Sequence, residues 1–162
     1  MRKRQAGFSV LELLVVGAVI AVIAAIAIYN YMAALNRAKQ KRTVNDIRVL
    51  AQAWEARATD TNSYGVAGFT FPGTDVPYAA LAAALRPTYL RDIPQVDGWL
   101  RPLQFGVEAG TDGSRGGYAI RSAGRDGLYQ TTYTSGATND PDCDIVFSDG
   151  TFIAFPDTIQ SN

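Results

Sequence analysis

Histidine is absent from the 162-residue chain, and Cys143 is its only cysteine. Without histidine there can be no Ser-His-Asp or Cys-His nucleophile pair and no histidine-ligated zinc. A single cysteine excludes an intramolecular disulfide and any metal site built from several cysteines. Lys and Arg balance Asp and Glu at 15 each, so no excess of positive charge indicates a nucleic-acid partner. These absences exclude many enzyme classes, and we expect a protein that is not an enzyme.

Charge is nearly missing from residues 8–31, where Glu12 is the only charged side chain. Roughly 20 apolar residues in a helix cross a bilayer, so this segment is long enough. A secretory signal peptide has a similar basic start, but its apolar region runs only about 7–15 residues. The uninterrupted apolar run 13–28 is longer than that. The segment therefore predicts a membrane-spanning helix.

Proline is absent before Pro72, and Gly17 is the only glycine between Gly7 and Gly65. Beyond the apolar segment, apolar side chains recur at spacings of three and four, which is typical of one helix face: Val44, Ile47, Leu50, Ala51 and Trp54. We predict one helix from about Ser9 to about Thr59, apolar on every side over 8–31 and amphipathic over 32–60. A helix that is apolar all round must be surrounded by lipid or protein.

Residues 7–16, GFSVLELLVV, resemble the cleavage and methylation segment of type IV pilins and type II secretion pseudopilins. The resemblance implies that a prepilin peptidase removes a leader, 1–7, by cutting between Gly7 and Phe8, and that the new Phe8 amine is N-methylated. It also gives Glu12 a role in assembly. By position alone, Glu12 either reaches the lipid headgroups or has a functional partner. In the family this glutamate pairs with the N-terminal amine of a neighbouring subunit, and an unpaired carboxylate in a dry filament core is strongly disfavoured.

The chain departs from the family pattern at two positions. Tyr29 stands where many pilins have proline, and Ala21 where they often have glycine. In several such filaments this segment loses helical hydrogen bonds during assembly. Without the two helix breakers, we expect a more continuous helix.

Residues 61–162 are rich in glycine, proline, aspartate and aromatic residues, as expected for a small domain with short strands and long loops. We predict a short helix over 77–86, strands over 102–107 and 118–122, and a hairpin joining 144–148 to 151–155 through Asp149 and Gly150. The predicted fold class is α+β, with a long N-terminal helix packed by its second half on a small antiparallel sheet. This is the ladle fold of pilins, in which Ile47, Leu50 and Trp54 complete the core of the head.

The head resembles the major type II secretion pseudopilin in three segments, YLRDIPQVDGW (89–99), YAIRSAGRDG (118–127) and DCDI (142–145). In those proteins the corresponding loop binds calcium, which takes about six to eight oxygen ligands. The resemblance implies a calcium site with Asp126 and Asp142 as the first ligands, joined by Ser122 and Asp144. The alternative is that these residues are ordinary turn formers.

The predicted function is that of a structural subunit of a type IV pilus-like filament, serving motility, adhesion or DNA uptake at the cell surface. The alternative is a major pseudopilin in a short periplasmic filament that drives protein export. A monomeric membrane-anchored binding module is a third possibility. An anchored hydrolase using Asp97 and Asp126 lacks an accompanying base or nucleophile motif.

The resemblance implies several partners: further copies of the chain, the prepilin peptidase, an inner-membrane assembly platform and minor pilins. Lipid surrounds the helix before assembly, and no nucleic acid is required. We expect the precursor in the bacterial inner membrane with its N-terminus in the cytoplasm, and the assembled subunit in an extracellular pilus or a periplasmic pseudopilus. Because basic residues also occur within 37–42, the charge distribution alone does not decide the orientation of the helix in the membrane. These basic residues form either a solvated helix face or a contact with lipid headgroups.

Overall fold

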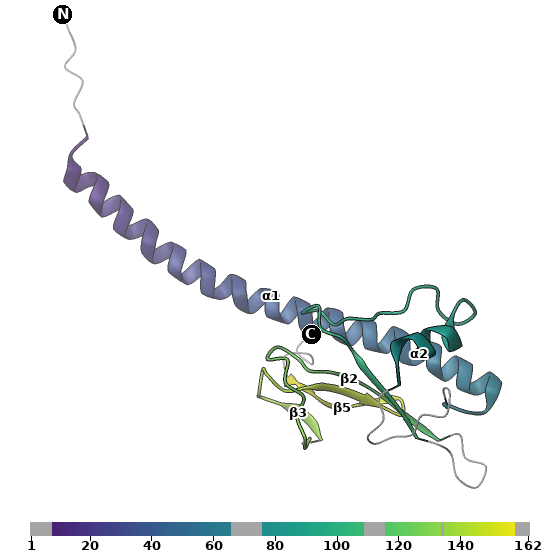
Figure 1. Ribbon diagram of the computed structural model, residues 1–162. Coiled ribbons are helices and arrows are strands. Elements are labelled where there is room, and N and C mark those ends of the chain that lie inside the picture. The colour runs from purple at the N-terminus through teal and green to yellow at the C-terminus, as the bar shows by residue number, and fades with distance from the viewer. Residues whose placement is uncertain (1–7, 66–75, 109–115, 134, 158–162) are drawn as a thin grey trace, which may run out of the picture. The chain divides into compact units, whose positions relative to one another are not determined.

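The computed structural model describes residues 8–65, 76–108, 116–133 and 135–157. The chain divides into two compact units, Met1–Asn36 and Arg37–Asn162. Helix α1 (Val10–Thr61) begins in the first unit and ends in the second. The second unit, which we call the head, also contains helix α2 (Tyr78–Leu85) and the sheet (Figure 1).

Helix α1 is the single long helix that the sequence predicts, and it ends two residues beyond the predicted boundary. Its helical hydrogen bonding is uninterrupted through Ala21 and Tyr29, as expected from the missing glycine and proline. The backbone turns away from the helix at Asn62, whose φ of 53° places it in the left-handed region that asparagine tolerates. The continuity of this segment within a filament stays a prediction.

The described strands form one mixed sheet of five strands in the order β1-β2-β4-β5-β3. Their bounds are Gln104–Glu108 for β1, Gly117–Ser122 for β2, Gly136–Thr138 for β3, Ile145–Ser148 for β4 and Thr151–Pro156 for β5. The β4–β5 hairpin is confirmed, with Ser148 paired to Thr151 across a two-residue turn. Asp149 and Gly150 have φ values of 48° and 87°, the conformation that a tight hairpin turn requires.

The predicted antiparallel pairing holds for three of the four described strand pairs, and β3 is the exception. β3 pairs in parallel with β5, with Ala137 opposite Phe155. The chain reaches this position by passing from β2 to the far edge of the sheet before it returns to form β4 and β5. β3 has only three residues, none of them buried, so its sequence carries no alternating apolar pattern that could have indicated a strand.

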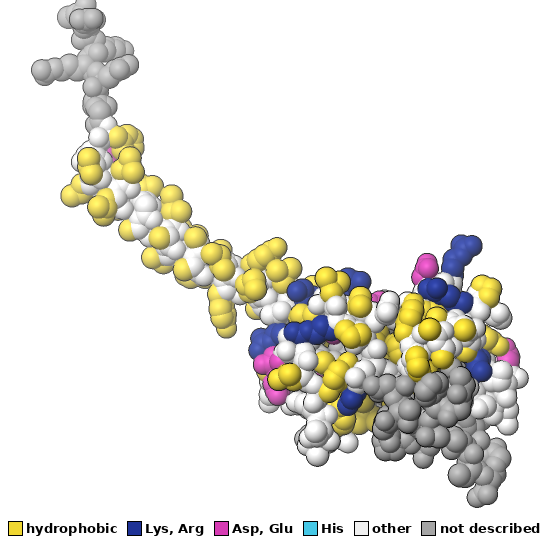
Figure 2. Space-filling view, viewed as in Figure 1, with side chains coloured by type: hydrophobic (Ala, Val, Ile, Leu, Met, Phe, Trp, Pro, Cys, Tyr) yellow, Lys and Arg dark blue, Asp and Glu magenta, His cyan; other side chains and the backbone are white. Residues whose placement is uncertain are grey.

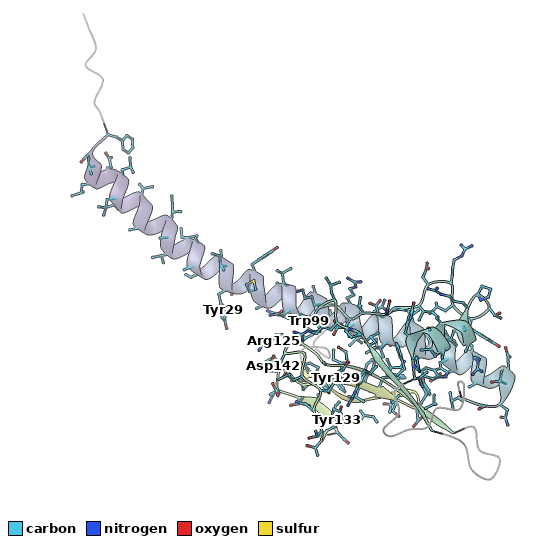
Figure 3. All side chains as sticks on the ribbon, viewed as in Figure 1. Tyr29, Trp99, Arg125, Tyr129, Tyr133 and Asp142 are labelled. Carbon is cyan, nitrogen blue, oxygen red and sulfur yellow. The ribbon has the colours of Figure 1, made fainter. Side chains whose placement is uncertain are left out.

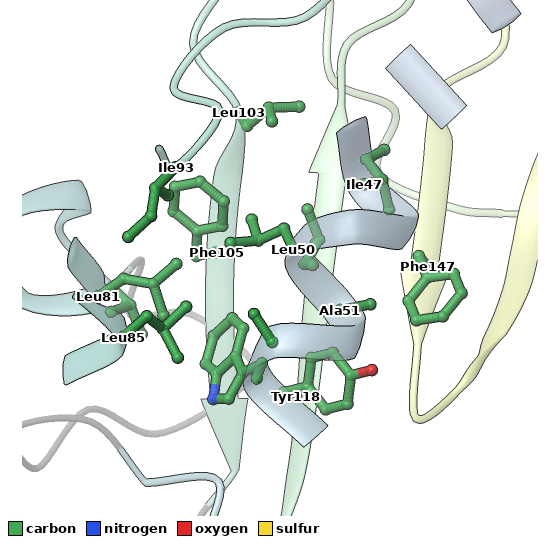
Figure 4. Close-up of a cluster of buried hydrophobic side chains, with 14 of the residues drawn as sticks. Ile47, Leu50, Ala51, Leu81, Leu85, Ile93, Leu103, Phe105, Tyr118 and Phe147 are labelled. Carbon is green, nitrogen blue, oxygen red and sulfur yellow. The ribbon is translucent and has the colours of Figure 1, made fainter. Parts of the chain in front are cut away.

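The core of the head lies between α1, α2 and one face of the sheet. Ile47, Leu50 and Trp54 on α1 are fully buried, as predicted. Figure 4 shows Leu50 directed toward Phe105 of β1, with Leu81 and Leu85 of α2 on the other side of that ring and Phe147 of β4 beside α1. Trp54 and Tyr118 pack their rings with centroids 5.1 Å apart. The second half of α1 is therefore part of the hydrophobic core.

We expect Leu50→Ala to lower the free energy of unfolding of the full-length chain in detergent by about 3 kcal/mol, because the change leaves a cavity in a fully buried site. The matched control is Val49→Ala on the same helix. The Val49 side chain is 37% exposed, so this change should alter stability by less than about 0.5 kcal/mol. Urea unfolding followed by tryptophan fluorescence measures both. Equal losses for the two variants would contradict the assignment of this face of α1 to the core.

Candidate functional site

The first turn of α1 is capped by Ser9. The Ser9 hydroxyl oxygen accepts a hydrogen bond from the Leu11 amide at 3.3 Å, and the Ser9 carbonyl accepts from the Leu13 amide at 3.2 Å. Glu12 lies in the same turn, where the positive end of the helix dipole favours a carboxylate. The spacing of Ser9 and Glu12 is that of a capping box, which agrees with the predicted start of the helix near Ser9.

The apolar part of α1 offers lipid or protein an unbroken surface. Every large apolar side chain from Phe8 to Met32 is exposed, on all sides of the helix. Figure 2 shows those on one face. Among the described residues, α1 is the one helix long and apolar enough to cross a membrane. Phe8 and Glu12 are both exposed at its start. Gly7, the other half of the predicted cleavage site, lies outside the described residues.

In the head, Asp97 is a fully buried carboxylate that organises a turn. Its Oδ1 accepts hydrogen bonds from the Trp99 amide at 2.8 Å and the Arg101 amide at 2.9 Å. Its Oδ2 accepts from the Ser122 hydroxyl at 2.7 Å. The carboxylate is thus satisfied by donors from two segments, and these hydrogen bonds give Asp97 a structural role in the turn.

The turn that Asp97 organises is fastened to α1. The Gly98 amide donates to the Thr43 hydroxyl at 2.8 Å, and that hydroxyl donates to the Lys39 carbonyl at 3.0 Å. A Cβ atom at position 98 would lie 2.3 Å from the Lys39 carbonyl oxygen. Only glycine can approach the helix backbone this closely. Neither contact was evident from the sequence, because nothing in the residue pattern links positions 43 and 98.

Asp144, the fourth predicted calcium ligand, is also fully buried but incompletely satisfied. Its Oδ2 accepts from the Gln130 amide at 3.0 Å and from the Tyr133 hydroxyl at 3.1 Å. Its Oδ1 is buried and has no hydrogen-bond partner among the described residues. Burial raises the pKa of the Asp144 carboxyl, and the charge of Asp126 adds to this increase.

The other predicted ligands have partners of their own. Asp142 forms an ion pair with Arg125 (Figure 3), with Nη2 of Arg125 donating to Oδ2 at 2.8 Å. Hydrogen bonding to this guanidinium lowers the pKa of Asp142. Ser122 donates to Asp97, and Asp126 accepts from the Leu128 amide at 3.0 Å. The four residues are therefore not gathered into one ligand set in this structure.

Arg121 joins the two tyrosines beside Asp144. Its Nη1 donates to the Tyr133 hydroxyl at 2.7 Å, and its guanidinium lies 4.3 Å from the centre of the Tyr129 ring. Figure 3 shows Tyr129 and Tyr133 on the connection between β2 and β3. Sequence reasoning did not single out these residues. Of the two, Tyr133 contacts the buried carboxylate through Oδ2, and Asp144 Oδ1 remains without a partner among the described residues.

A calcium ion would fit this cluster in part. A buried carboxylate oxygen without a hydrogen-bond partner is a suitable ligand for a cation, and Asp126 lies close enough to influence Asp144 electrostatically. However, the described residues include no group of three or more Cys, Asp or Glu side chains placed to hold a metal. Backbone carbonyls would have to supply the remaining ligands, as they commonly do for calcium.

Comparison with known proteins gives two results that bear on the N-terminus and on the whole chain. Residues 2–28 match the family described as the prokaryotic N-terminal methylation motif. The type II secretion system core protein G of Aeromonas hydrophila is 30% identical, over 74% of this chain and 96% of that protein. The proteins of the same name from Pseudomonas aeruginosa and Dickeya chrysanthemi are 28% and 30% identical, over 87% and 81% of this chain and 94% and 84% of theirs. No solved structure matches the chain.

We expect Asp97→Ala to lower the free energy of unfolding by about 3 kcal/mol, because the buried Ser122 hydroxyl and two half-buried backbone amides would lose their acceptor. Hydrogen exchange of the Trp99 and Arg101 amides should accelerate at the same time. The control is Asp92→Ala, which removes an exposed carboxylate from the same loop and should change little. Unchanged exchange at both amides in Asp97→Ala would show that the turn does not depend on this carboxylate.

Proposed function

The chain belongs to the family of type IV pilins and type II secretion pseudopilins, with the type II secretion core protein G as its relatives, and we propose that it is a major pseudopilin. As such it is the structural subunit of a short periplasmic filament that drives protein export. The observation that carries this proposal is the relationship to core protein G over 96% of the length of the Aeromonas protein.

The comparisons favour this alternative over the surface pilus that the sequence first suggested. The segments that resemble the major pseudopilin end at residue 145, and further residues follow them. In the structure these residues form β4 and β5, which lie within the single sheet of the head. The C-terminal segment thus contributes to the folded head, and its presence gives no reason to separate the chain from the core protein G family.

The mechanism of assembly follows from α1. Its apolar surface is satisfied by lipid before assembly and by the helices of neighbouring subunits afterwards. We propose that Glu12 remains charged during this transfer by pairing with the Phe8 amine of a neighbour. In a medium of low dielectric such a pair is strong and each unpaired charge is costly. The pairing therefore favours one register between subunits.

Processing precedes assembly in this proposal. A prepilin peptidase cuts between Gly7 and Phe8 at the cytoplasmic face, and the Phe8 amine is methylated. The precursor is held in the bacterial inner membrane by α1, which is consistent with the length and apolarity of that helix. An inner-membrane platform and minor pilins then incorporate the subunit into a filament of identical copies. None of these steps requires nucleic acid.

We also propose that the head binds calcium through Asp144 and Asp126, with backbone carbonyls completing the ligand set. The unpartnered Oδ1 of Asp144 supports this proposal. A bound calcium ion would neutralise these carboxylates and stabilise the connection that carries Gln130 and Tyr133. The Arg125 ion pair of Asp142 leaves that residue a weaker candidate than the sequence resemblance implied.

Replacing Glu12 tests the assembly mechanism. In the host bacterium, we expect Glu12→Ala to reduce filaments and secreted proteins at least about tenfold, because one unpaired charge in the core costs several kcal/mol. The mature N-terminus should still begin with methylated Phe8, as measured by mass spectrometry. The control is Asp46→Ala, which removes a partly exposed carboxylate further along the same helix. Normal amounts of filament in processed, stable Glu12→Ala protein would refute the pairing. Two results together would refute the pseudopilin assignment: surface fibres built from the chain in the wild-type strain, and unimpaired protein export in a strain that lacks the chain.

Calcium binding and pH should act on Asp144 together. Because burial raises its pKa, the ionised form destabilises the calcium-free fold. Stability should therefore fall as pH rises through the raised pKa, and the full cost is present above it. We expect calcium at about a hundredfold excess over its Kd to stabilise the wild type at pH 7 by about 2.7 kcal/mol.

The matched variants are Asp144→Asn, which removes the buried charge, and Asp92→Asn, which removes an exposed one. Thermal unfolding with calcium or a chelator should show no calcium effect and no pH slope of this origin in Asp144→Asn, and both effects in Asp92→Asn. An equal calcium response in Asp144→Asn would exclude Asp144 as a ligand. If the stability of the wild-type chain does not respond to calcium but still depends on pH, calcium binding is refuted, while the raised pKa of Asp144 is retained.

A further inference from the structure

Positive charge is concentrated just beyond the apolar part of α1. Arg37, Lys39, Lys41 and Arg42 follow one another with no acidic residue before Asp46. From Thr43 to the end of the chain, by contrast, Asp and Glu number 14 and Lys and Arg only 8. We call the four basic residues the collar. Apart from the collar, the head therefore carries a net negative charge.

The collar encircles much of the helix. Successive residues turn by about 100°, so Arg37 and Lys41 lie close in direction while Arg42 and Lys39 lie toward the opposite side. Arg37, Lys41 and Arg42 are exposed, Lys39 is half-buried, and Gln40 is buried on the side of the head. Dark blue side chains are visible along this part of α1 in Figure 2. Because the basic side chains of the collar point in several directions, they fit negatively charged surroundings on several sides of α1 better than a partner that binds one face.

An exposed apolar residue lies on the turn that is fastened to the collar. Gly98 contacts the backbone of Lys39, and two residues later Leu100 is 73% exposed. The φ angle of Leu100 is 67°, in the left-handed region that costs a non-glycine residue stability. The hydrogen bonds of Asp97 to neighbouring amides maintain this turn. The fold therefore maintains an exposed leucine beside the collar in a costly backbone conformation.

The position along the helix corresponds to the surface of a bilayer. Tyr29 and Tyr31 are exposed near the end of the apolar stretch, and tyrosine is enriched at membrane interfaces. Arg37 follows Tyr31 by about 9 Å along the helix, and Arg42 by about 16 Å. When the apolar stretch spans the hydrocarbon, the collar therefore begins just outside the headgroup layer, which its long Arg and Lys side chains can reach by extending back toward the membrane.

We propose that the collar binds anionic lipid headgroups, with Leu100 as an apolar contact in the interfacial region. The contact holds the head of the unassembled subunit against the outer surface of the inner membrane. This inference uses one part of the proposed function, namely that α1 spans the membrane with its N-terminus in the cytoplasm. The acidic remainder of the head is repelled by the same lipids, so the collar also determines which side of the head faces the membrane.

A second copy of the chain is the competing partner, since its acidic surface would also attract the collar. Lipid is favoured because the basic side chains point in several directions around α1. In addition, the ion pairs found among the described residues engage few of the collar side chains, so most of these side chains can bind lipid. Arg42 makes one i,i+4 contact with Asp46 at 3.5 Å, a surface pair of small energetic value. Outside the apolar segment, Leu100 also belongs to the few exposed large apolar residues among those described.

Tryptophan fluorescence of the full-length chain can test this proposal. Trp99 neighbours the collar through Gly98, whereas Trp54 is fully buried and lies about 22 Å along α1 from Lys39. The chain is placed at one copy per nanodisc of phosphatidylcholine or phosphatidylglycerol, each with the same fraction of a lipid that carries a nitroxide quencher near its headgroup. We expect about twofold stronger quenching in phosphatidylglycerol, and loss of the difference in about 0.5 M salt.

Two triple variants remove equal charge. R37Q/K41Q/R42Q should abolish the difference between the lipids, whereas R57Q/R86Q/R91Q should retain it. Leu100→Asn, which tolerates the left-handed backbone, should reduce quenching in both lipids. Equal quenching of the wild type in the two lipids, or a lipid difference that persists in the collar variant, would overturn the proposal. A difference that appears only with two copies per disc would assign the collar to contacts between subunits. None of these readouts requires filament assembly, so they are separate from the test of Glu12.

Discussion

The structure depends on one constraint, which is that a single helix must satisfy two different surroundings. Over residues 8–32 every large apolar side chain of α1 is exposed, so water is the wrong solvent for this part on all sides. Over its last turns the same helix buries Leu50 and Trp54 in the head. The first part is therefore stable only in lipid or among other helices, while the second part is stable only with the sheet.

The long helix and the hairpin could be predicted because local signals define them. The absence of glycine and proline breakers, the spacing from Val44 to Trp54 and the Asp149-Gly150 pair each act over a few residues. β3 could not be predicted, since its three residues follow no pattern and its position depends on pairing with β5. The turn at Gly98 was missed for a similar reason, because its partner Lys39 is distant in sequence.

For the acidic residues too, the sequence gives the residue type but not the surroundings of the side chain. The sequence could nominate Asp97, Asp126, Asp142 and Asp144, but it could not say which of them is satisfied. Asp97 and Asp144 are both fully buried, and only the first has donors for both oxygens. Asp142 is balanced by Arg125 at the surface. The free-energy cost of a buried carboxylate depends on such partners, and these come from segments far apart along the chain.

The order of strands in the sheet also has a consequence for how the head is made. β3 precedes β4 and β5 in the chain, yet among the described strands its hydrogen-bonded neighbour is β5. During synthesis, this strand emerges before its partner exists, and it has nothing to pair with until the hairpin behind it is complete. The edge of the sheet is therefore completed after the last strand has left the ribosome, so a chain cut short after β4 would leave β3 without its partner strand.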